Sequence, residues 1–307
     1  MRKTTQYVAK IPDATGHIQY TVEENQVWAD LYSAQRSRVD HYCAAEYLQG
    51  LGKVGLSAHE VPSCAEVSET LLALTGWKVE PVPALIGFSR FFDMLANRTF
   101  PAASFIRDRQ HFDYIEEPDI FHELFGHTPL LTDQRFADFS EFIGEAGMRA
   151  SPEDYAWLIR LYWFTIEFGL TRENGSYKAL GSGLASSPTE LVYSVESKTP
   201  ERKPFDVIDI LRTPYRIDIH QPIYFVLEHS DKLFSACERD LLADIRTARQ
   251  LGLHPPVYSP VTKSAWRSSC RTRICQTITA SRVMGSFRHS PPVRSLHLPR
   301  RSMLSGR

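Results

Sequence analysis

The 307-residue chain combines 43% hydrophobic with 23% charged residues, the balance of an ordinary folded domain. That length suffices to bury a substantial core in one or two domains. No apolar run reaches the ~18 residues of a membrane-spanning helix, and the N-terminal residues lack the apolar region of a signal peptide. For this reason we expect no contact with a membrane. The five cysteines have no metal-binding spacing and fit reduced thiols, so we expect a cytoplasmic protein.

Charge is distributed unevenly along the chain, although the net charge is only −1. Residues 260–307 contain ten lysines and arginines and no acidic residue, so the first 259 residues carry 25 basic against 36 acidic side chains. The acidic body would not attract nucleic acid, and we expect no nucleic-acid partner. We therefore divide the chain into one folded domain, residues 1–258, which we expect to carry the function, and a basic segment, residues 259–307.

The basic segment is rich in Arg, Ser and Pro and shows no apolar periodicity. A segment of this composition cannot bury enough apolar surface to order itself. Three interpretations remain open: a disordered tail, an out-of-frame translation past a frameshift, and an arm that binds an anionic partner.

Helical periodicity and capping residues predict a mainly α domain of packed helices with a few short strands. Ser63 with Glu66 forms a capping-box pattern at one helix start, and Ser151 followed by Pro152 predicts another. The expected elements, in chain order, are an extended arm over 7–20, helices over 25–51, 63–74 and 88–95, irregular or strand-like chain over 97–112, helices over 132–147, 152–168, 187–194 and 204–211, a strand over 221–224, and a last helix over 230–251.

The most informative pattern lies in the proline-bounded stretch 118–129, where His122 and His127 flank Glu123. Neutral imidazole is the commonest protein ligand for iron or zinc. On an α-helix, residues five apart lie ~140° apart around the axis, against ~40° for residues four apart, so this is not the zinc-peptidase spacing. Both histidines can converge on one ion if the helix ends between them, near Gly126, with His127 just past the last turn. The alternative is two buried, hydrogen-bonded histidines without a metal.

A third candidate ligand stands in the apolar helical run 162–170, where Glu167 is the one carboxylate. A buried, unpaired carboxylate costs several kcal/mol or takes up a proton, so a glutamate in this setting usually has a cation or a hydrogen-bond donor beside it. The alternative is a surface ion pair with Arg160 or Arg172. Two histidines and one carboxylate leave an octahedral ion half open, as in non-haem Fe(II) oxygenases.

Three separated stretches, 118–127, 162–170 and 177–190, closely resemble the pterin-dependent aromatic amino acid hydroxylases, above all their short bacterial members. The resemblance covers about residues 7–258, and the stretches occur in the family's order and spacing. It implies one catalytic domain with an iron ion in a central cleft. It also implies hydroxylation of L-phenylalanine to L-tyrosine by dioxygen, with Fe(II) and tetrahydropterin (tetrahydrobiopterin or a bacterial equivalent) as cofactors, by a monomer.

The resemblance also implies roles for individual residues. The iron ligands would be His122, His127 and Glu167, while the pterin would lie beside Leu85, Ile86, Phe91 and Glu123. Arg107 would clamp the carboxylate of the substrate through two parallel hydrogen bonds. The other substrate positions would be Tyr114, Pro118, Trp163, Phe168, Gly183 and Ser186. The chain departs from the animal members at Ile115, where they carry a threonine, which removes a side-chain hydrogen bond there.

Other interpretations stay open from the residues themselves. Phe91 belongs to a helical stripe that is typical of a core, and Arg107 could form a surface ion pair with Asp108 or Asp113. Tryptophan is the alternative substrate within the family. A zinc-dependent hydrolase with Glu123 as base is the alternative enzyme class, and a structural metal protein whose basic segment binds nucleic acid is the non-enzymatic one.

Overall fold

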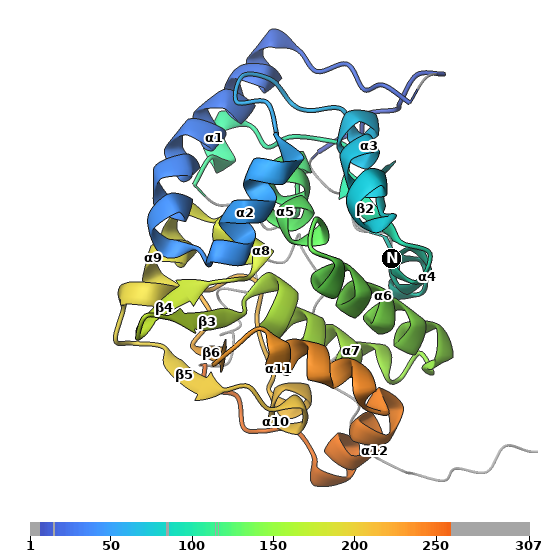
Figure 1. Ribbon diagram of the computed structural model, residues 1–307, viewed down its shortest axis with the longest axis vertical. Coiled ribbons are helices and arrows are strands. Elements are labelled where there is room, and N and C mark those ends of the chain that lie inside the picture. The colour runs from blue at the N-terminus through green and yellow to red at the C-terminus, as the bar shows by residue number, and fades with distance from the viewer. Residues whose placement is uncertain (1–6, 15, 84–85, 114, 116, 259–307) are drawn as a thin grey trace, which may run out of the picture. The chain divides into compact units, whose positions relative to one another are not determined.

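The computed structural model describes residues 7–14, 16–83, 86–113, 115 and 117–258, which lie in one compact unit (Figure 1). Within these residues the fold is mainly α with a few short strands, as the sequence predicts. Two expected site residues, Leu85 and Tyr114, lie outside the described residues, as does the basic segment from residue 259. No helix in the described part of the chain is long and apolar enough to span a membrane.

The N-terminal third of the domain is built from three helices, α1 (Val22–Tyr42), α2 (Ala45–Val54) and α3 (Cys64–Thr75). The single helix expected over 25–51 is wrong, because the chain is extended at Cys43 and Ala44. There the Ala44 N–H donates to the carbonyl of Ala179, 2.8 Å away, so a contact with a distant strand interrupts the helix. At α3 the expected capping box of Ser63 and Glu66 is present.

The strands form two small sheets. In the first, β1 (Lys78–Val82) pairs in parallel with β2 (Thr99–Ala103), and α4 (Phe88–Ala96) connects them. The second has the order β4-β3-β6-β5, formed by β3 (Leu170–Glu173), β4 (Ser176–Ala179), β5 (Glu201–Pro204) and β6 (Ile223–Leu227). Asn174 and Gly175 connect β3 to β4 with φ of 49° and 79°. An Asn-Gly pair favours this turn, but the sequence analysis predicted no strand here and so missed the hairpin.

The other helices are α5 (Thr128–Leu131), α6 (Gln134–Arg149), α7 (Tyr155–Tyr162), α8 (Ser182–Ala185), α9 (Pro188–Glu196), α10 (Val207–Arg212), α11 (Asp231–Phe234) and α12 (Leu241–Leu251). Several predicted boundaries are wrong, and two of them have a clear local cause. The expected cap Ser151 instead donates to the carboxylate of Asp154, 2.8 Å away, and α7 begins after it. The helix expected over 230–251 is broken by a 3₁₀ turn, after which Asp240 caps α12.

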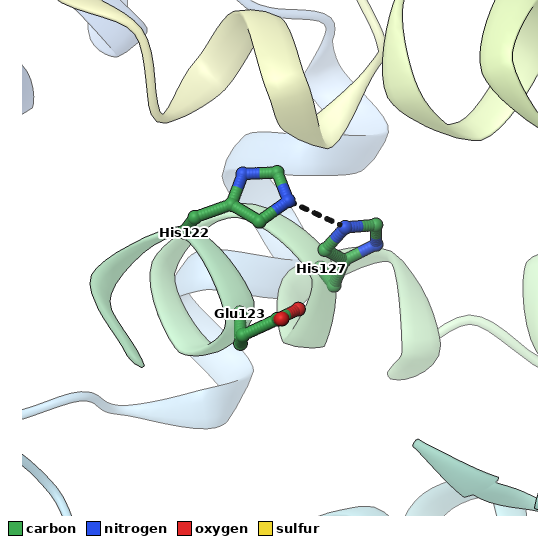
Figure 2. A group of neighbouring side chains, drawn as sticks. All are labelled: His122, Glu123 and His127. Atoms are coloured by element: carbon green, nitrogen blue, oxygen red, sulfur yellow. Dashed lines mark hydrogen bonds between the residues drawn. The ribbon is translucent and has the colours of Figure 1, made fainter. Parts of the chain in front are cut away.

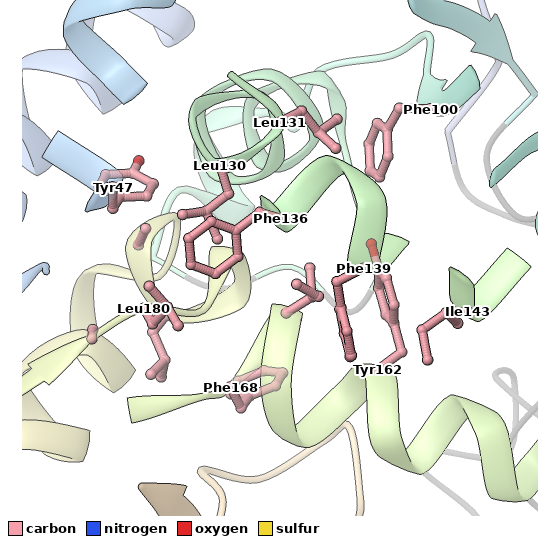
Figure 3. Packing of buried hydrophobic residues seen from close by; sticks show 14 of the residues in the cluster. Tyr47, Phe100, Leu130, Leu131, Phe136, Phe139, Ile143, Tyr162, Phe168 and Leu180 are labelled. Atoms are coloured by element: carbon pink, nitrogen blue, oxygen red, sulfur yellow. The ribbon is translucent and has the colours of Figure 1, made fainter. Parts of the chain in front are cut away.

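The core that supports the site lies where α4, α6 and α7 pack side by side (Figure 1). Its largest members are buried aromatic side chains from several helices, part of which Figure 3 shows. Phe92 of α4 is fully buried, whereas Phe91 is half-buried and meets Tyr162 of α7 edge to face, with ring centroids 5.4 Å apart. Phe91 therefore lies between the core and the surroundings of His127, because Tyr162 stacks against that histidine.

Glu190 is a buried carboxyl group in the same domain. It accepts hydrogen bonds from the backbone N–H of Gln221, at 2.7 Å, and from the hydroxyl of Tyr224, at 2.8 Å. Burial outweighs these two bonds and raises the pKa of Glu190 to about 7. Folding therefore favours the protonated form of this group.

This shift predicts a pH dependence of stability. A carboxyl group whose pKa is raised by folding stabilises the native state below its ordinary pKa, and that contribution is lost as pH rises from ~4.5 through ~7. Glu190→Gln keeps an acceptor without a charge. We expect its free energy of unfolding, relative to wild type, to rise by roughly 3 kcal/mol between pH 4.5 and pH 8. Urea titration of the metal-free proteins measures this, and parallel pH profiles would contradict it.

Candidate metal centre

The two histidines of the central motif lie in a π-helical turn, His122–His127, which continues directly into α5. A π-helix bonds residue i to residue i+5, so residues five apart come to lie above one another. The Nε2 atoms of His122 and His127 are 3.1 Å apart. Figure 2 shows the two rings facing each other across this contact. The expectation that the helix ends between the histidines is therefore wrong: the backbone widens instead, and Gly126 lies inside the turn.

Glu167 lies in a second π-helical turn, Trp163–Glu167, which follows α7. Its Oε1 is 3.1 Å from His127 Nε2 and its Oε2 is 3.7 Å from His122 Nε2. The alternative of a surface pair with Arg160 or Arg172 is wrong. Arg160 lies over the ring of Trp157, and Arg172 pairs with Glu228.

A divalent ion fits between these groups. Nitrogen and oxygen ligands bind such ions at ~2.1 Å, so ligand pairs at right angles stand ~3 Å apart, near the observed spacings. The outer nitrogens face hydroxyl groups: His122 Nδ1 is 2.8 Å from Ser186 Oγ, and His127 Nδ1 is 3.4 Å from the hydroxyl of Tyr162. Partners of this kind orient an imidazole so that its other nitrogen can bind a metal. Two imidazoles and one carboxylate suit iron.

The electrostatics favour the ligand forms of these side chains. Burial lowers the pKa of His122 to about 4, so its imidazole is neutral at pH 7. Burial alone would raise the pKa of Glu167, but the two histidines and the hydrogen bonds from His127 and Ser182 lower it to about 2. Metal ligands must be deprotonated, and both side chains meet that condition near neutral pH.

Glu123 is the other carboxyl group near the histidines. Its oxygen and the histidine nitrogens lie within 4.8 Å of one another, so it is a competing third ligand (Figure 2). We favour Glu167, because its oxygens are closer to both nitrogens. Burial and the charge of Glu167 also raise the pKa of Glu123 well above its usual range, and a protonated carboxyl is a poor ligand.

Arg107 does not form the surface ion pair with Asp108 or Asp113 that was the alternative to a substrate clamp. Its Nε and Nη2 donate to the two carboxylate oxygens of Asp119, at 2.7 and 2.8 Å, in a buried pair. Burial opposes ionisation of Asp119, but Arg107 and backbone hydrogen bonds hold its pKa below the usual range. Asp119 therefore occupies the Nε and Nη2 edge of the guanidinium, and Nη1 donates a longer hydrogen bond, 3.5 Å, to the carbonyl of Phe112.

Asp119 is a site residue that the sequence analysis missed. Besides Arg107, it accepts a hydrogen bond from the backbone N–H of His122, at 3.1 Å, and so anchors the first residue of the π-helical turn. The signal was in the motif itself, where Asp119 stands three residues before His122, the spacing of a side chain that caps a helix start.

The expected aromatic slot is brought together in the fold. Trp163 stacks on Tyr215 with ring centroids 4.3 Å apart, and it meets Phe168 at 4.4 Å. A Cβ on Gly183 would lie 2.9 Å from the ring of Phe168, so a side chain there would displace that ring. Two further contacts of Trp163 escaped the sequence analysis: Tyr215, and Gln221, whose Oε1 accepts from the indole N–H at 3.2 Å.

The remaining expected positions are less closely tied to the centre. Pro118 is half-buried and immediately precedes Asp119, and Ser186 lies against His122 as described above. Phe91 contacts Tyr162, which in turn stacks on His127, and Ile86 is half-buried before α4.

Comparisons with known proteins agree with this geometry. The family model for biopterin-dependent aromatic amino acid hydroxylases matches residues 2–255. The chain is 46% identical over 259 residues to a phenylalanine-4-hydroxylase of Vibrio cholerae, covering 84% of this chain and 90% of that one. The apo structure of the cold-active phenylalanine hydroxylase from Colwellia psychrerythraea matches with a TM-score of 0.80 and 45% identity, over 81% of this chain and 97% of that chain. A Chromobacterium violaceum phenylalanine hydroxylase with bound oxidised Fe(III) matches with a TM-score of 0.76 and 36% identity, over 82% of this chain and 92% of that chain.

The choice between the two glutamates can be tested directly. Glu167→Gln keeps the size of the side chain but removes the charge that neutralises a cation, so we expect Fe(II) or Co(II) affinity to fall by more than ~100-fold, beyond the usual effect of residues that only support a ligand. Glu123→Gln removes a carboxyl group whose raised pKa already disfavours its charged form, so we expect this variant to bind metal as wild type does. Chelator competition measures both affinities. The reverse pattern would make Glu123 the third ligand.

Proposed function

The chain belongs to the biopterin-dependent aromatic amino acid hydroxylases, and we propose that it holds its catalytic iron between His122, His127 and Glu167. It is an iron- and tetrahydropterin-dependent monooxygenase that converts L-phenylalanine to L-tyrosine. The observation that carries the ligand assignment is the convergence of Nε2 of both histidines and the Glu167 carboxylate from two π-helical turns. We propose dioxygen as the second substrate.

When bound, iron and tetrahydropterin supply the electrons and the activated oxygen that a closed-shell aromatic ring requires. The protein contributes positions and protonation states. Burial lowers the pKa of His122 and the two histidines lower that of Glu167, so their unprotonated forms are favoured, while burial and the charge of Glu167 raise the pKa of Glu123. We propose that Glu123, Ile86 and Phe91, together with Leu85, line the pterin position.

We propose that the aromatic ring of the substrate lies against the cluster of Trp163, Phe168 and Gly183. Support comes from the ring contacts of the indole, on which Tyr215 stacks and which Phe168 meets at an angle of 33°. An apolar slot of this kind excludes water and orients a planar ring. Pro118, Tyr114 and Ser186 complete the proposed substrate contacts.

Arg107 is the proposed partner of the substrate carboxylate. Asp119 holds two of its nitrogens, so the guanidinium is fixed in one orientation before a substrate arrives. A preorganised cation loses less side-chain freedom when it binds a carboxylate. Because Asp119 also bonds the backbone of His122, the same carboxylate connects the substrate side to the metal side.

Product analysis tests the function as a whole. The purified protein is supplied with Fe(II), tetrahydropterin and dioxygen, and with phenylalanine, tyrosine or tryptophan in turn. We expect tyrosine from phenylalanine as the main product. Preferred hydroxylation of tryptophan would change the substrate, and hydrolase activity with bound zinc would overturn the reaction class.

The clamp makes a prediction of its own. Arg107→Lys keeps the charge but loses the planar fork. Since a charge-assisted hydrogen bond contributes roughly 1.5–3 kcal/mol, we expect KM for phenylalanine to rise at least ~10-fold while KM for the pterin changes much less. The matched control is Arg98→Lys, whose arginine forms a similar fork with Glu141 on the surface. Equal effects on both KM values would mean that Arg107 only supports the fold.

For the chain as a whole we propose that residues 1–258 form the catalytic domain, that the protein is a monomer, and that it works in the cytoplasm. The family model ends at residue 255, close to this boundary. Size-exclusion chromatography with light scattering tests the monomer.

A final prediction concerns the basic segment. Every proposed site residue precedes Leu191, so truncation after Tyr258 should leave metal affinity and hydroxylation unchanged within ~2-fold. Limited trypsin digestion, mass measurement and an activity assay check this, with polyanion binding measured on both forms. Loss of activity in the truncated form would mean that the catalytic domain extends beyond residue 258. Polyanion binding by the full chain but not by the truncated form would favour the anionic-partner interpretation.

A further inference from the structure

We propose that Ser182 is a positioning residue of the metal centre, whose hydroxyl fixes the carboxylate of Glu167 and thereby sets the affinity for the metal. The inference rests on the proposed ligand set. The sequence analysis assigned no role to this serine, which stands between two glycines at the start of α8.

The contacts of Ser182 join both halves of the ligand set. The side chain is fully buried, and its Oγ lies 3.1 Å from Glu167 Oε2 and 3.1 Å from His127 Nε2. The third neighbour is the carbonyl of Ile166, at 2.9 Å. One hydroxyl therefore touches a proposed ligand from each of the two π-helical turns.

The single proton of this hydroxyl has one preferred acceptor. As a ligand, His127 Nε2 carries no proton and its lone pair is engaged, so the hydroxyl proton is left for the carboxylate or for the Ile166 carbonyl. A hydrogen bond to an ionised carboxylate is stronger than one to a neutral carbonyl. Bonding to Oε2 fixes the rotation of the Glu167 carboxylate, with Oε1 3.1 Å from His127 Nε2.

The backbone around Ser182 leaves the hydroxyl little freedom. A Cβ on Gly181 would lie 2.1 Å from the carbonyl oxygen of Glu167, and a Cβ on Gly126 would lie 2.8 Å from the carbonyl oxygen of Ser182. The start of α8 is thus pressed against both π-helical turns. A donor held this closely is suited to orient a ligand rather than to adapt to it.

A second serine shows the same arrangement for a different ligand. Ser186 follows four residues later, donates to the carbonyl of Ser182 at 2.9 Å, and lies 2.8 Å from His122 Nδ1. The two hydroxyls, one helical turn apart, therefore approach different members of the ligand set, and Ser182 alone contacts the carboxylate.

The test compares Ser182→Thr with Ser182→Val, two side chains of the same shape of which only threonine has a hydroxyl. Co(II) is titrated into each metal-free protein, with chelator competition for the affinity and the cobalt absorption bands for the ligand field. Loss of a group that supports a metal ligand typically weakens binding 10–100-fold, so we expect valine to bind Co(II) ~10-fold or more weakly than threonine. At saturating Fe(II), KM for phenylalanine and pterin should agree within ~2-fold.

Ser182→Ala and Ser194→Ala complete the set. Ser194 is also fully buried, but its hydroxyl donates only to the carbonyl of Leu191 in its own helix, so its removal should leave Co(II) affinity and spectrum unchanged. Wild-type Co(II) affinity in Ser182→Ala, or equal affinity in the threonine and valine variants, overturns the role of Ser182. Wild-type affinity in His122→Ala would overturn the ligand set instead, so the two failures are distinguishable.

Discussion

The i to i+5 hydrogen bonding of two π-helical turns is the constraint on which the site depends. In an α-helix, His122 and His127 would point ~140° apart and could not share an ion. The wider turn brings their Nε2 atoms to 3.1 Å, and a second such turn presents Glu167 to the same point. A π-helical turn is rare, so packing must hold it in place. Here α8 presses its backbone against both turns, at Gly126 and at the carbonyl of Glu167.

The buried pair of Arg107 and Asp119 holds the start of the first π-helical turn in place. Removing two charges from water costs several kcal/mol per ion unless hydrogen bonds satisfy the remaining lone pairs. Asp119 meets that condition, because its two oxygens accept from Nε and Nη2 of Arg107 and from the backbone N–H groups of Arg107 and His122. The pair therefore links Arg107, the proposed partner of the substrate carboxylate, to the backbone of His122, a proposed metal ligand. Replacing either charge would disturb both sides, which is why a substrate effect at Arg107 has to be separated from a structural one.

Local signals were sufficient for most of the helices. Ser63 and Glu66 form the predicted capping box from residues three apart, because caps are decided by neighbouring residues. The turn at Asn174-Gly175 is equally local, but its hairpin was not predicted. The π-helical turns could not be predicted, since their support is remote: Ser182 lies 55 residues from His127, and Asp119 lies 12 residues from Arg107. For the same reason the residues alone left metal binding at the histidines open. The family resemblance supplied the proposed ligand set, but it did not indicate Asp119, Ser182 or Gln221.

Two carboxyl groups beside the same histidines have pKa values that are shifted in opposite directions. Both are desolvated, which by itself favours the neutral acid. Glu167 has compensation from His127, His122 and the Ser182 hydroxyl, and its pKa falls to about 2. Glu123 has the negative charge of Glu167 nearby instead, and its pKa rises. The ionisation of one carboxyl thus helps to keep the other protonated. When the surroundings push the pKa values of two neighbouring groups apart, one group can remain an acid while the other serves as a base or a ligand. A residue that fixes Glu167 as the anion, as Ser182 is placed to do, therefore also acts on the state of Glu123.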